Sequence, residues 1–365
     1  YSIIPRAIQT QTGLQTRESE LYIWVVKPDG TAVWRSVRLA PLLQNTTLAE
    51  LVSQSRAAIG VRGRGLGVVA QSEARDTVAP SSLQRLYQIL IAPIAAHLPS
   101  ETTQRVIFIP QGNLFLVPFA ALQDANGKDL IEQHTVSTAP SIQVFTLTQQ
   151  QLQKTGKSNA SALIVGNPTM PKVVVNLGQP PEQLSPLPGA EQEAIAIAQL
   201  LGTQPLLGDR ATKASVVQQI QSVRLAHLAT HGLLDDFRGL GMPGAIALAP
   251  TDRDDGLLTA SDILDLKLKA DLVTLSACDT GRGRITGDGV IGLSRSFMAA
   301  GTPSIVVSLW AVPDAPTAFL MTEFYRQLQQ KPDKAQALRQ AMLFTKQRYK
   351  NPIDWAAFTL IGEAE

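Results

Sequence analysis

One cysteine and one histidine each stand shortly after a run of apolar residues. Cys278, the only cysteine in the chain, follows the run 272–275, and His231 follows the run 225–229. Each run predicts a buried strand, and the carboxyl ends of parallel strands meet at one edge of a sheet. We therefore expect the two side chains to lie close together. An imidazole beside a thiol takes up its proton or stabilises the thiolate, so the pattern predicts a Cys–His dyad for nucleophilic chemistry.

The glycine after the histidine supplies a second element of the same chemistry. Gly232 has no side chain beside its amide, so its N–H can approach a developing negative charge closely. The N–H groups of Gly232 and Cys278 are the candidate oxyanion hole for a tetrahedral intermediate. Spacing alone leaves an alternative open, because a lone cysteine is usually a small buried apolar residue, and a histidine in an apolar run is usually a core residue.

Two further groups of residues resemble metal sites only in part. His227 lies four residues before His231, but in a strand this separation is ~13 Å, too far for one metal ion. We therefore predict that His227 is a buried structural residue. The acidic residues of 251–256 resemble half of a calcium-binding loop, yet the position of the required glutamate is occupied by Ile263. The sequence predicts a polar turn there, with no metal site and no cofactor.

Apolar strands that alternate with amphipathic helices must place these residues. The pattern predicts strands at 162–165, 225–229, 246–248, 272–275, 304–309 and 355–361, and helices at 141–153, 189–202, 212–221, 290–300, 316–330 and 334–346. Such alternation is typical of an α/β fold with a largely parallel sheet covered on both faces. Glu191 and Glu193 are expected in the first turn of the helix 189–202, where the helix dipole favours acidic residues. The interval 168–187 is predicted to be a long loop.

The N-terminal residues follow a different pattern. Residues 1–17 are polar and are predicted to be a linker. The segments 21–26 and 32–39 flank the turn sequence 27–30 and predict a β-hairpin. Because the first residue is Tyr1 rather than Met, we expect the chain to be a fragment or a processed product.

Composition argues against several classes of function. The 32 basic and 30 acidic residues leave a formal net charge of +2, which argues against nucleic acid or an anionic membrane as a partner. A single thiol forms no internal disulfide and gives no sign of an oxidising compartment. The longest apolar runs are far shorter than the ~20 residues that span a bilayer, and no signal peptide is visible. We expect a soluble, cytoplasmic protein.

Five ordered motifs resemble a known family. They are 227–232 (HLATHG), 255–260 (DGLLTA), 275–281 (LSACDTG), 287–297 (GDGVIGLSRSF) and 308–314 (SLWAVPD). Together they resemble the CHAT domain, whose relatives are caspases, gingipains and separases, over residues 80–365. The lead-in at 21–26 is similar to that of bacterial CHAT proteins with tetratricopeptide repeats upstream, although no such repeat is visible in this sequence.

The resemblance implies a caspase-like three-layer sandwich, with a largely parallel sheet and helices on both faces. It implies an N-terminal extension of hairpin and helix at 1–79, a degenerate caspase-like half at 80–158 and a half bearing the dyad at 159–365. It also implies a cysteine endopeptidase that cleaves protein substrates through a thioester acyl-enzyme. Cys278 would be the nucleophile and His231 the acid or base.

The resemblance identifies the substrate-binding residues less clearly than it identifies the dyad. In relatives that cut after Lys, Arg or Asn, an acidic residue often stands two positions before the cysteine and lines the pocket for the P1 side chain. That position is Ser276 here. Asp279 and Asp288 are candidate substitutes, and Trp310 follows another strand at the same edge of the sheet. Neighbouring arginines would instead favour an acidic P1 residue, so the sequence leaves the P1 side chain open.

Two functions remain as alternatives, a regulated cysteine endopeptidase and a catalytically inactive CHAT module that binds proteins. The loops 168–187 and 235–244 flank the strand that ends before His231, and long loops in compact domains are often lids or binding loops. We expect the isolated chain to hold a complete dyad but an incompletely formed substrate groove. A regulatory protein or upstream tetratricopeptide repeats would complete it.

Overall fold

The chain divides into two compact units, Tyr1–Val136 and Ser137–Glu365. The computed structural model describes residues 1–10, 13–43, 46–61, 81–154, 161–174, 180–233, 244–276 and 287–365. The expected three-part division at 79 and 158 remains a prediction. Among the described residues, no helix has the length and apolar character needed to cross a membrane.

An antiparallel sheet opens the first unit and consists of β1 (Ser2–Thr10), β2 (Gly13–Val26) and β3 (Ala32–Arg38). The predicted hairpin is confirmed as β2 and β3, with Gly30 at a φ of 84° in the turn. The predicted linker at 1–17 is wrong, because most of it forms β1 and the start of β2. Cross-strand pairing with β2 stabilises β1, and the ring of Tyr1 anchors its start beside Phe108 and Phe119.

Short helices and one further strand complete the first unit. They are α1 (Ala40–Leu43), α2 (Leu48–Ala58), α3 (Ser82–Leu90), η1 (Ala92–His97), β4 (Arg105–Phe108), η2 (Gly112–Leu116), η3 (Phe119–Ala121) and α4 (Leu130–Gln133). α2 and α3 each begin at a capping box, formed by Thr47 with Glu50 and by Ser81 with Gln84. These side chains satisfy backbone N–H groups that have no partner within the helix.

A largely parallel sheet forms the centre of the second unit. In spatial order its strands are β5 (Thr135–Thr138, at the boundary between the units), β16 (Phe358–Gly362), β15 (Ser304–Ser308), β14 (Leu272–Leu275), β10 (Leu225–Ala229), β6 (Ala162–Pro168) and β9 (Leu206–Gly208). These neighbours pair in parallel, except that β16 runs antiparallel to β15. The strands predicted at 225–229 and 272–275 have the expected bounds.

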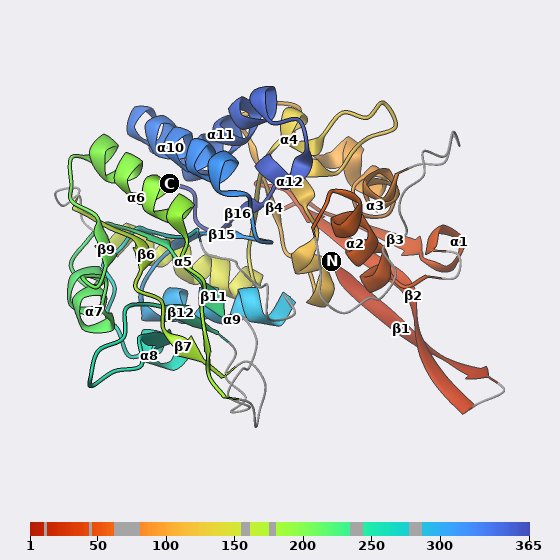
Figure 1. Ribbon diagram of the computed structural model, residues 1–365. Helices are drawn as coiled ribbons and strands as arrows, with labels where there is room; N and C mark the ends of the chain where they lie inside the picture. The colour runs from red at the N-terminus through yellow and green to blue at the C-terminus, as the bar shows by residue number, and fades with distance from the viewer. Residues whose placement is uncertain are drawn as a thin grey trace. The chain divides into compact units, whose positions relative to one another are not determined.

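Helices cover both faces of this sheet, which confirms the predicted α/β class and its three layers (Figure 1). On one face lie α6 (Pro188–Leu201), α10 (Asp314–Gln330) and α11 (Lys334–Arg348), and on the other lie α5 (Ile142–Lys154) and α9 (Gly287–Ala300). The shorter helices are α7 (Lys213–Ile220), α8 (Ala260–Leu264) and α12 (Pro352–Trp355). The last strand begins at Phe358 rather than at Trp355, because the fully buried Trp355 ends α12.

Two small antiparallel sheets stand beside the main one. β11 (Gly232–Leu233), β12 (Ala245–Ala247) and β13 (Leu257–Thr259) form the first. The predicted loop 168–187 contains the second, a hairpin of β7 (Lys172–Val173) and β8 (Glu182–Gln183). Apolar side chains from both sheets form one buried cluster, which consists of Met170, Val173, Leu184, Ala245, Ala247 and Leu257. The cluster holds the 168–187 segment against the residues that follow His231.

Candidate active site

His231 lies at the carboxyl end of β10, where the chain passes into β11. Its carbonyl accepts a hydrogen bond from the Ala247 N–H at 2.9 Å, and the hydroxyl of Thr230 donates to the Ala247 carbonyl at 2.7 Å. The next residue, Gly232, pairs with Ile246 in the small sheet. Main-chain pairing therefore fixes the backbone at His231, and other contacts must orient its ring.

A backbone carbonyl orients the ring of His231, a residue that is 2% exposed. Nε2 lies 2.7 Å from the carbonyl oxygen of Ser185. A carbonyl oxygen only accepts hydrogen bonds, so Nε2 carries a proton and donates it. In the neutral imidazole the basic lone pair is then on Nδ1. Ser185 was not predicted, because every residue has a backbone carbonyl and its use leaves no trace in the sequence.

The ends of β10 and β14 are aligned with each other. Leu228 of β10 pairs in register with Leu275 of β14. Ser276 follows β14 directly and His231 follows β10 after one intervening residue, so both stand at the carboxyl edge of the sheet. The position of His231 at this edge agrees with the strand pattern, and the position of Cys278 beside it remains a prediction.

The structure describes only some of the other predicted site residues. Cys278 and Asp279 lie outside the described residues, and Asp288 is described only through its place in the backbone of α9. Trp310 is fully buried, and its indole N–H donates to the carbonyl of Ile353 at 3.0 Å. It does not line the pocket at this edge of the sheet, and a role for it in substrate binding remains a prediction.

A pocket of about 220 Å³ opens beside these strand ends. The strands contribute Thr230, Ser276, Ser308 and Phe358, and the α6 and α10 side contributes Leu187, Ala190, Glu193, Ala311, Val312, Asp314 and Thr317. Thr230 directly precedes His231, and Ser276 stands two positions before Cys278. The pocket is therefore lined by residues within two positions of each member of the predicted dyad.

The first turns of α6 and α10 touch at Gly189. A Cβ atom placed on Gly189 would lie 2.1 Å from the Cβ of Asp314, closer than real atoms approach. Only the absence of a side chain at Gly189 allows Asp314 to occupy its position at the pocket. This contact sets how close the two helices come at this point.

Both charged residues of the pocket lining are acidic. Asp314 is exposed, whereas Glu193 is 2% exposed and places its Oε1 3.0 Å from Nε2 of His227. The prediction that Glu193 lies in the first turn of this helix is wrong, because α6 begins at Pro188 and Glu191 is the acidic residue in its first turn. The side chain of Glu193 is instead buried in the protein. Two carboxylates, with no lysine or arginine among the lining residues, make the pocket unfavourable for a third carboxylate.

His227 belongs to a buried polar network, as its predicted structural role requires. Its Nδ1 lies 3.0 Å from the hydroxyl of Tyr325, which donates to Oγ1 of Thr274 at 2.9 Å. The residues from Glu193 through His227 and Tyr325 to Thr274 are all buried. Burial raises the pKa of Tyr325; the hydrogen bond to Thr274 opposes this shift and the charge of Glu193 adds to it. These contacts use both ring nitrogens of His227 within the interior.

The acidic segment 251–256 forms a tight turn, which confirms the prediction. The carboxylate of Asp254 accepts a hydrogen bond from the Gly256 N–H at 2.8 Å, and that of Asp255 accepts one from the Leu257 N–H at 3.0 Å. Such contacts are typical of Asx turns. Within the part of the chain that the structure describes, no three His, Cys, Asp or Glu residues form a group that could hold a metal ion.

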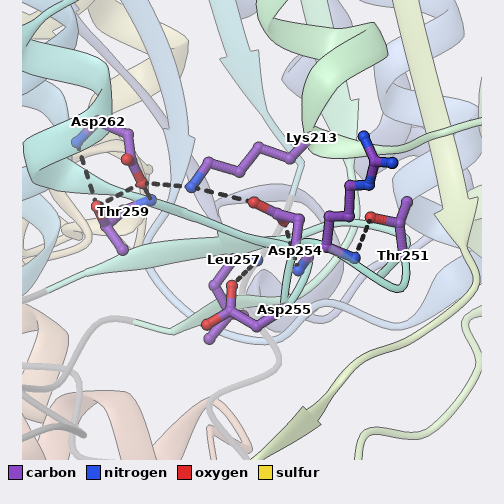
Figure 2. A network of polar contacts seen from close by, with 9 residues as sticks. Lys213, Thr251, Asp254, Asp255, Leu257, Thr259 and Asp262 are labelled. Atoms are coloured by element: carbon purple, nitrogen blue, oxygen red, sulfur yellow. Dashed lines mark hydrogen bonds and ion pairs between the residues drawn. The ribbon is translucent and has the colours of Figure 1, made fainter.

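A lysine joins this turn to α8 (Figure 2). Lys213 Nζ lies 3.0 Å from Asp262 and 3.7 Å from Asp254. Asp262 and Thr259 also form the capping box of α8. Burial acts to raise the pKa of Asp262, but the Thr259 hydrogen bonds and Lys213 outweigh it and lower the pKa. Since β13 ends at Thr259, the network anchors the small sheet that carries Gly232.

Comparison with known proteins identifies related sequences. The family model of the CHAT domain matches residues 80–363. Tetratricopeptide repeat protein 28 of Mus musculus and that of Homo sapiens are each 31% identical to this chain over 332 residues. These alignments cover 79% of this chain and 13% of each relative, so the chain spans about an eighth of their length.

Two solved structures are similar to this chain in fold. The separase–securin complex of Saccharomyces cerevisiae matches with a TM-score of 0.45 and 13% identity, over 71% of this chain and 16% of that chain. The Arg-specific cysteine proteinase gingipain R matches with a TM-score of 0.40 and 13% identity, over 63% of this chain and 54% of that chain.

Proposed function

Because this chain belongs to the CHAT family, we propose that it is a cysteine endopeptidase with Cys278 as nucleophile and His231 as acid and base. The observation that carries the proposal is the contact between His231 Nε2 and the Ser185 carbonyl. In this contact the Nε2–H donates to the carbonyl, so the basic lone pair of the neutral ring is on Nδ1. A general base with a fixed tautomer, at a sheet edge beside a pocket, suits thiol activation.

The proposed reaction proceeds through a thioester. Nδ1 of His231 takes the thiol proton, and the Cys278 thiolate adds to the substrate carbonyl carbon. The N–H groups of Gly232 and Cys278 hold the resulting oxyanion. As the C–N bond breaks, the imidazolium gives its proton to the leaving amine. Water then adds to the thioester with its proton going to Nδ1, and the C–S bond breaks to release a carboxylic acid and the thiol.

In this proposal the pocket beside the dyad receives the P1 side chain of the substrate. Ser276 and Thr230, which line it, adjoin the two reacting residues in sequence. The acidic lining, Glu193 and Asp314, disfavours an anionic P1 residue. Asp279 and Asp288 remain candidate contributors to substrate binding.

We further propose that a regulatory protein or a region upstream controls this site in a cytoplasmic protein. The segment 168–187, expected to be a lid or binding loop, supplies the carbonyl that orients His231. A partner that shifts this segment would change the orientation of the His231 ring and the position of its proton. Turnover of a peptide library by this chain alone that equals its turnover with the upstream region or a partner present would contradict such regulation.

The test of the peptidase is covalent labelling with a peptidyl acyloxymethyl ketone library, read by intact mass, alongside cleavage of a peptide library. We expect one adduct, at Cys278, and none in Cys278→Ala. His231→Ala should lose the labelling, whereas His97→Ala, at a histidine in the first unit, should keep it. Equal labelling of wild type and His231→Ala would reject the dyad and favour an inactive CHAT module that binds proteins.

A further inference from the structure

We infer that Asn167 is a positioning residue for His231, because its side chain fixes the segment whose Ser185 carbonyl accepts the His231 proton. The catalytic meaning of this role rests on the proposed peptidase function. The contacts that link Asn167 to His231 do not rest on that function, because they are observed directly between residues of the second unit.

The backbone of Asn167 has an unusual φ, and both the oxygen and the nitrogen of its side-chain amide form hydrogen bonds. It lies near the end of β6 with a φ of 42°, a left-handed value that non-glycine residues rarely adopt. Its Oδ1 accepts a hydrogen bond from the Leu187 N–H at 2.7 Å, and its Nδ2 donates to Glu191 Oε2 at 2.9 Å. A strained conformation that is held by two side-chain contacts indicates a position selected for what the side chain binds.

These contacts make Asn167 a substitute cap for α6. Leu187 is the N-cap residue of this helix and provides no capping hydrogen bond from its own side chain. Asn167, twenty positions earlier in the chain, takes up the Leu187 N–H and ties it to Glu191 in the first turn. The start of α6 is therefore fixed to the end of a central strand.

Ser185 is held from both sides as a result. On its N-terminal side, Leu184 is 4% exposed in the apolar cluster, and its N–H donates to the Pro171 carbonyl at 3.2 Å. On its C-terminal side, Asn167 anchors Leu187, and the prolines at 186 and 188 restrict the backbone between. With both anchors in place, the Ser185 carbonyl is aimed at His231 Nε2 at 2.7 Å.

Loss of the Asn167 side-chain contacts should change which ring nitrogen of His231 carries the proton, while the fold is retained. Without them, Leu187 can bond to water and the Ser185 carbonyl is free to turn. The His231 ring then loses the acceptor that selects the Nε2–H tautomer, and the other tautomer places its proton on Nδ1. In that form the ring cannot accept the thiol proton at Nδ1.

The test is ¹⁵N-histidine NMR of the whole chain, which reports the tautomer without any enzymatic activity. The His231 signal is assigned with His231→Gln. We expect a slowly exchanging Nε2–H in the wild type, and exchange roughly tenfold faster in Asn167→Gly, because the hydrogen bond that protects it is loosened. Glycine tolerates the left-handed φ, so this variant removes the amide without adding backbone strain.

Two further variants serve as controls. Glu191→Gln keeps an oxygen that accepts from Asn167 and should match the wild type. Asn167→Asp keeps the acceptor for Leu187 but places a second oxygen against Glu191, and should lie between the wild type and Asn167→Gly; it also replaces the glycine variant if that does not fold. Wild-type exchange of the His231 Nε2–H in both folded Asn167 variants would overturn the inference.

A second readout separates this inference from the proposed function. The rate of Cys278 alkylation by iodoacetamide is measured against pH in the same variants, since this reagent needs no P1 pocket. A slower rate and a shifted pH profile in Asn167→Gly support both ideas. If wild-type Cys278 reacts no faster than a free thiol while the NMR effect is present, the peptidase proposal fails and the positioning role stands.

Discussion

Two histidines four residues apart, His227 within β10 and His231 just past its end, have different surroundings. His227 is enclosed by side chains of the interior, with Glu193 at one ring nitrogen and Tyr325 at the other. His231 stands past the strand end, and its ring is oriented by the Ser185 carbonyl of a neighbouring segment. A histidine fixed by core side chains at both ring nitrogens holds helices to a sheet, whereas one whose Nε2 is held by a main-chain carbonyl at a strand end suits proton transfer.

Replacing His231 should give the largest effect and act mainly on chemistry. We expect His231→Ala to slow Cys278 labelling by roughly 10²–10⁴-fold, the usual loss of a general base. Its free energy of unfolding should fall by only ~1–2 kcal/mol, because the lost ring makes a hydrogen bond to Ser185 while main-chain pairing still holds the backbone at this position. Mass spectrometry against time and calorimetry measure the two quantities. A large fall in stability with unchanged labelling would reverse the roles of the two histidines.

Replacing His227 should do the opposite and act on folding. His227→Ala removes a fully buried ring that contacts Glu193 and Tyr325, and such a loss from the interior typically costs ~2–5 kcal/mol in the free energy of unfolding. Tyr325→Phe removes only the hydroxyl between His227 and Thr274 and should cost ~1–2 kcal/mol. Urea unfolding measures both values. Equal values for the two variants would contradict an important buried contact between His227 and Glu193.

The acidic lining of the pocket predicts which P1 side chains a substrate can carry. Peptides with Asp at P1 should be cut more slowly than peptides with Asn at P1, because Glu193 and Asp314 repel a third carboxylate. Asp314→Asn should narrow this difference by a few-fold, since Asp314 is exposed and solvent screens its charge. Matched kcat/KM values for P1 Asp and P1 Asn provide the measurement. Faster cleavage after Asp would show that the pocket binds another part of the substrate.

The smallest effect is expected at the network of Lys213 and Asp262. The pKa of Asp262 is lowered from its usual 3.8, so its folded-state contribution is present above pH 3.8 and is lost as the pH falls below that value. Because Asp262 is partly exposed, we expect the contribution to be at most ~1 kcal/mol. Unfolding of the wild type and of Asp262→Asn, measured between pH 2 and 6, should converge at low pH. A constant difference would show that the charge plays no part.

The central sheet could be predicted because its strands are buried on both faces. Apart from His227 and Thr274, β10 and β14 consist of apolar residues, so their bounds and the edge on which His231 stands follow from residue type. β1 could not be found this way, since it has no continuous apolar run and is stabilised by pairing with β2, the next segment of the chain. Ser185 and Asn167 were missed for a related reason. Their roles depend on a carbonyl and on a left-handed φ, and neither is encoded by a local pattern.

The contact between Gly189 and Asp314 bears on how this site could be altered. A methyl group at Gly189 must displace Asp314, because the two would otherwise overlap. Gly189→Ala is therefore expected to move the first turn of α10 outward and admit larger P1 side chains, which the ratio of cleavage after large and small residues would report. Selectivity for side-chain size could thus diverge between otherwise similar enzymes through one hydrogen-to-methyl exchange, with the reacting residues unchanged.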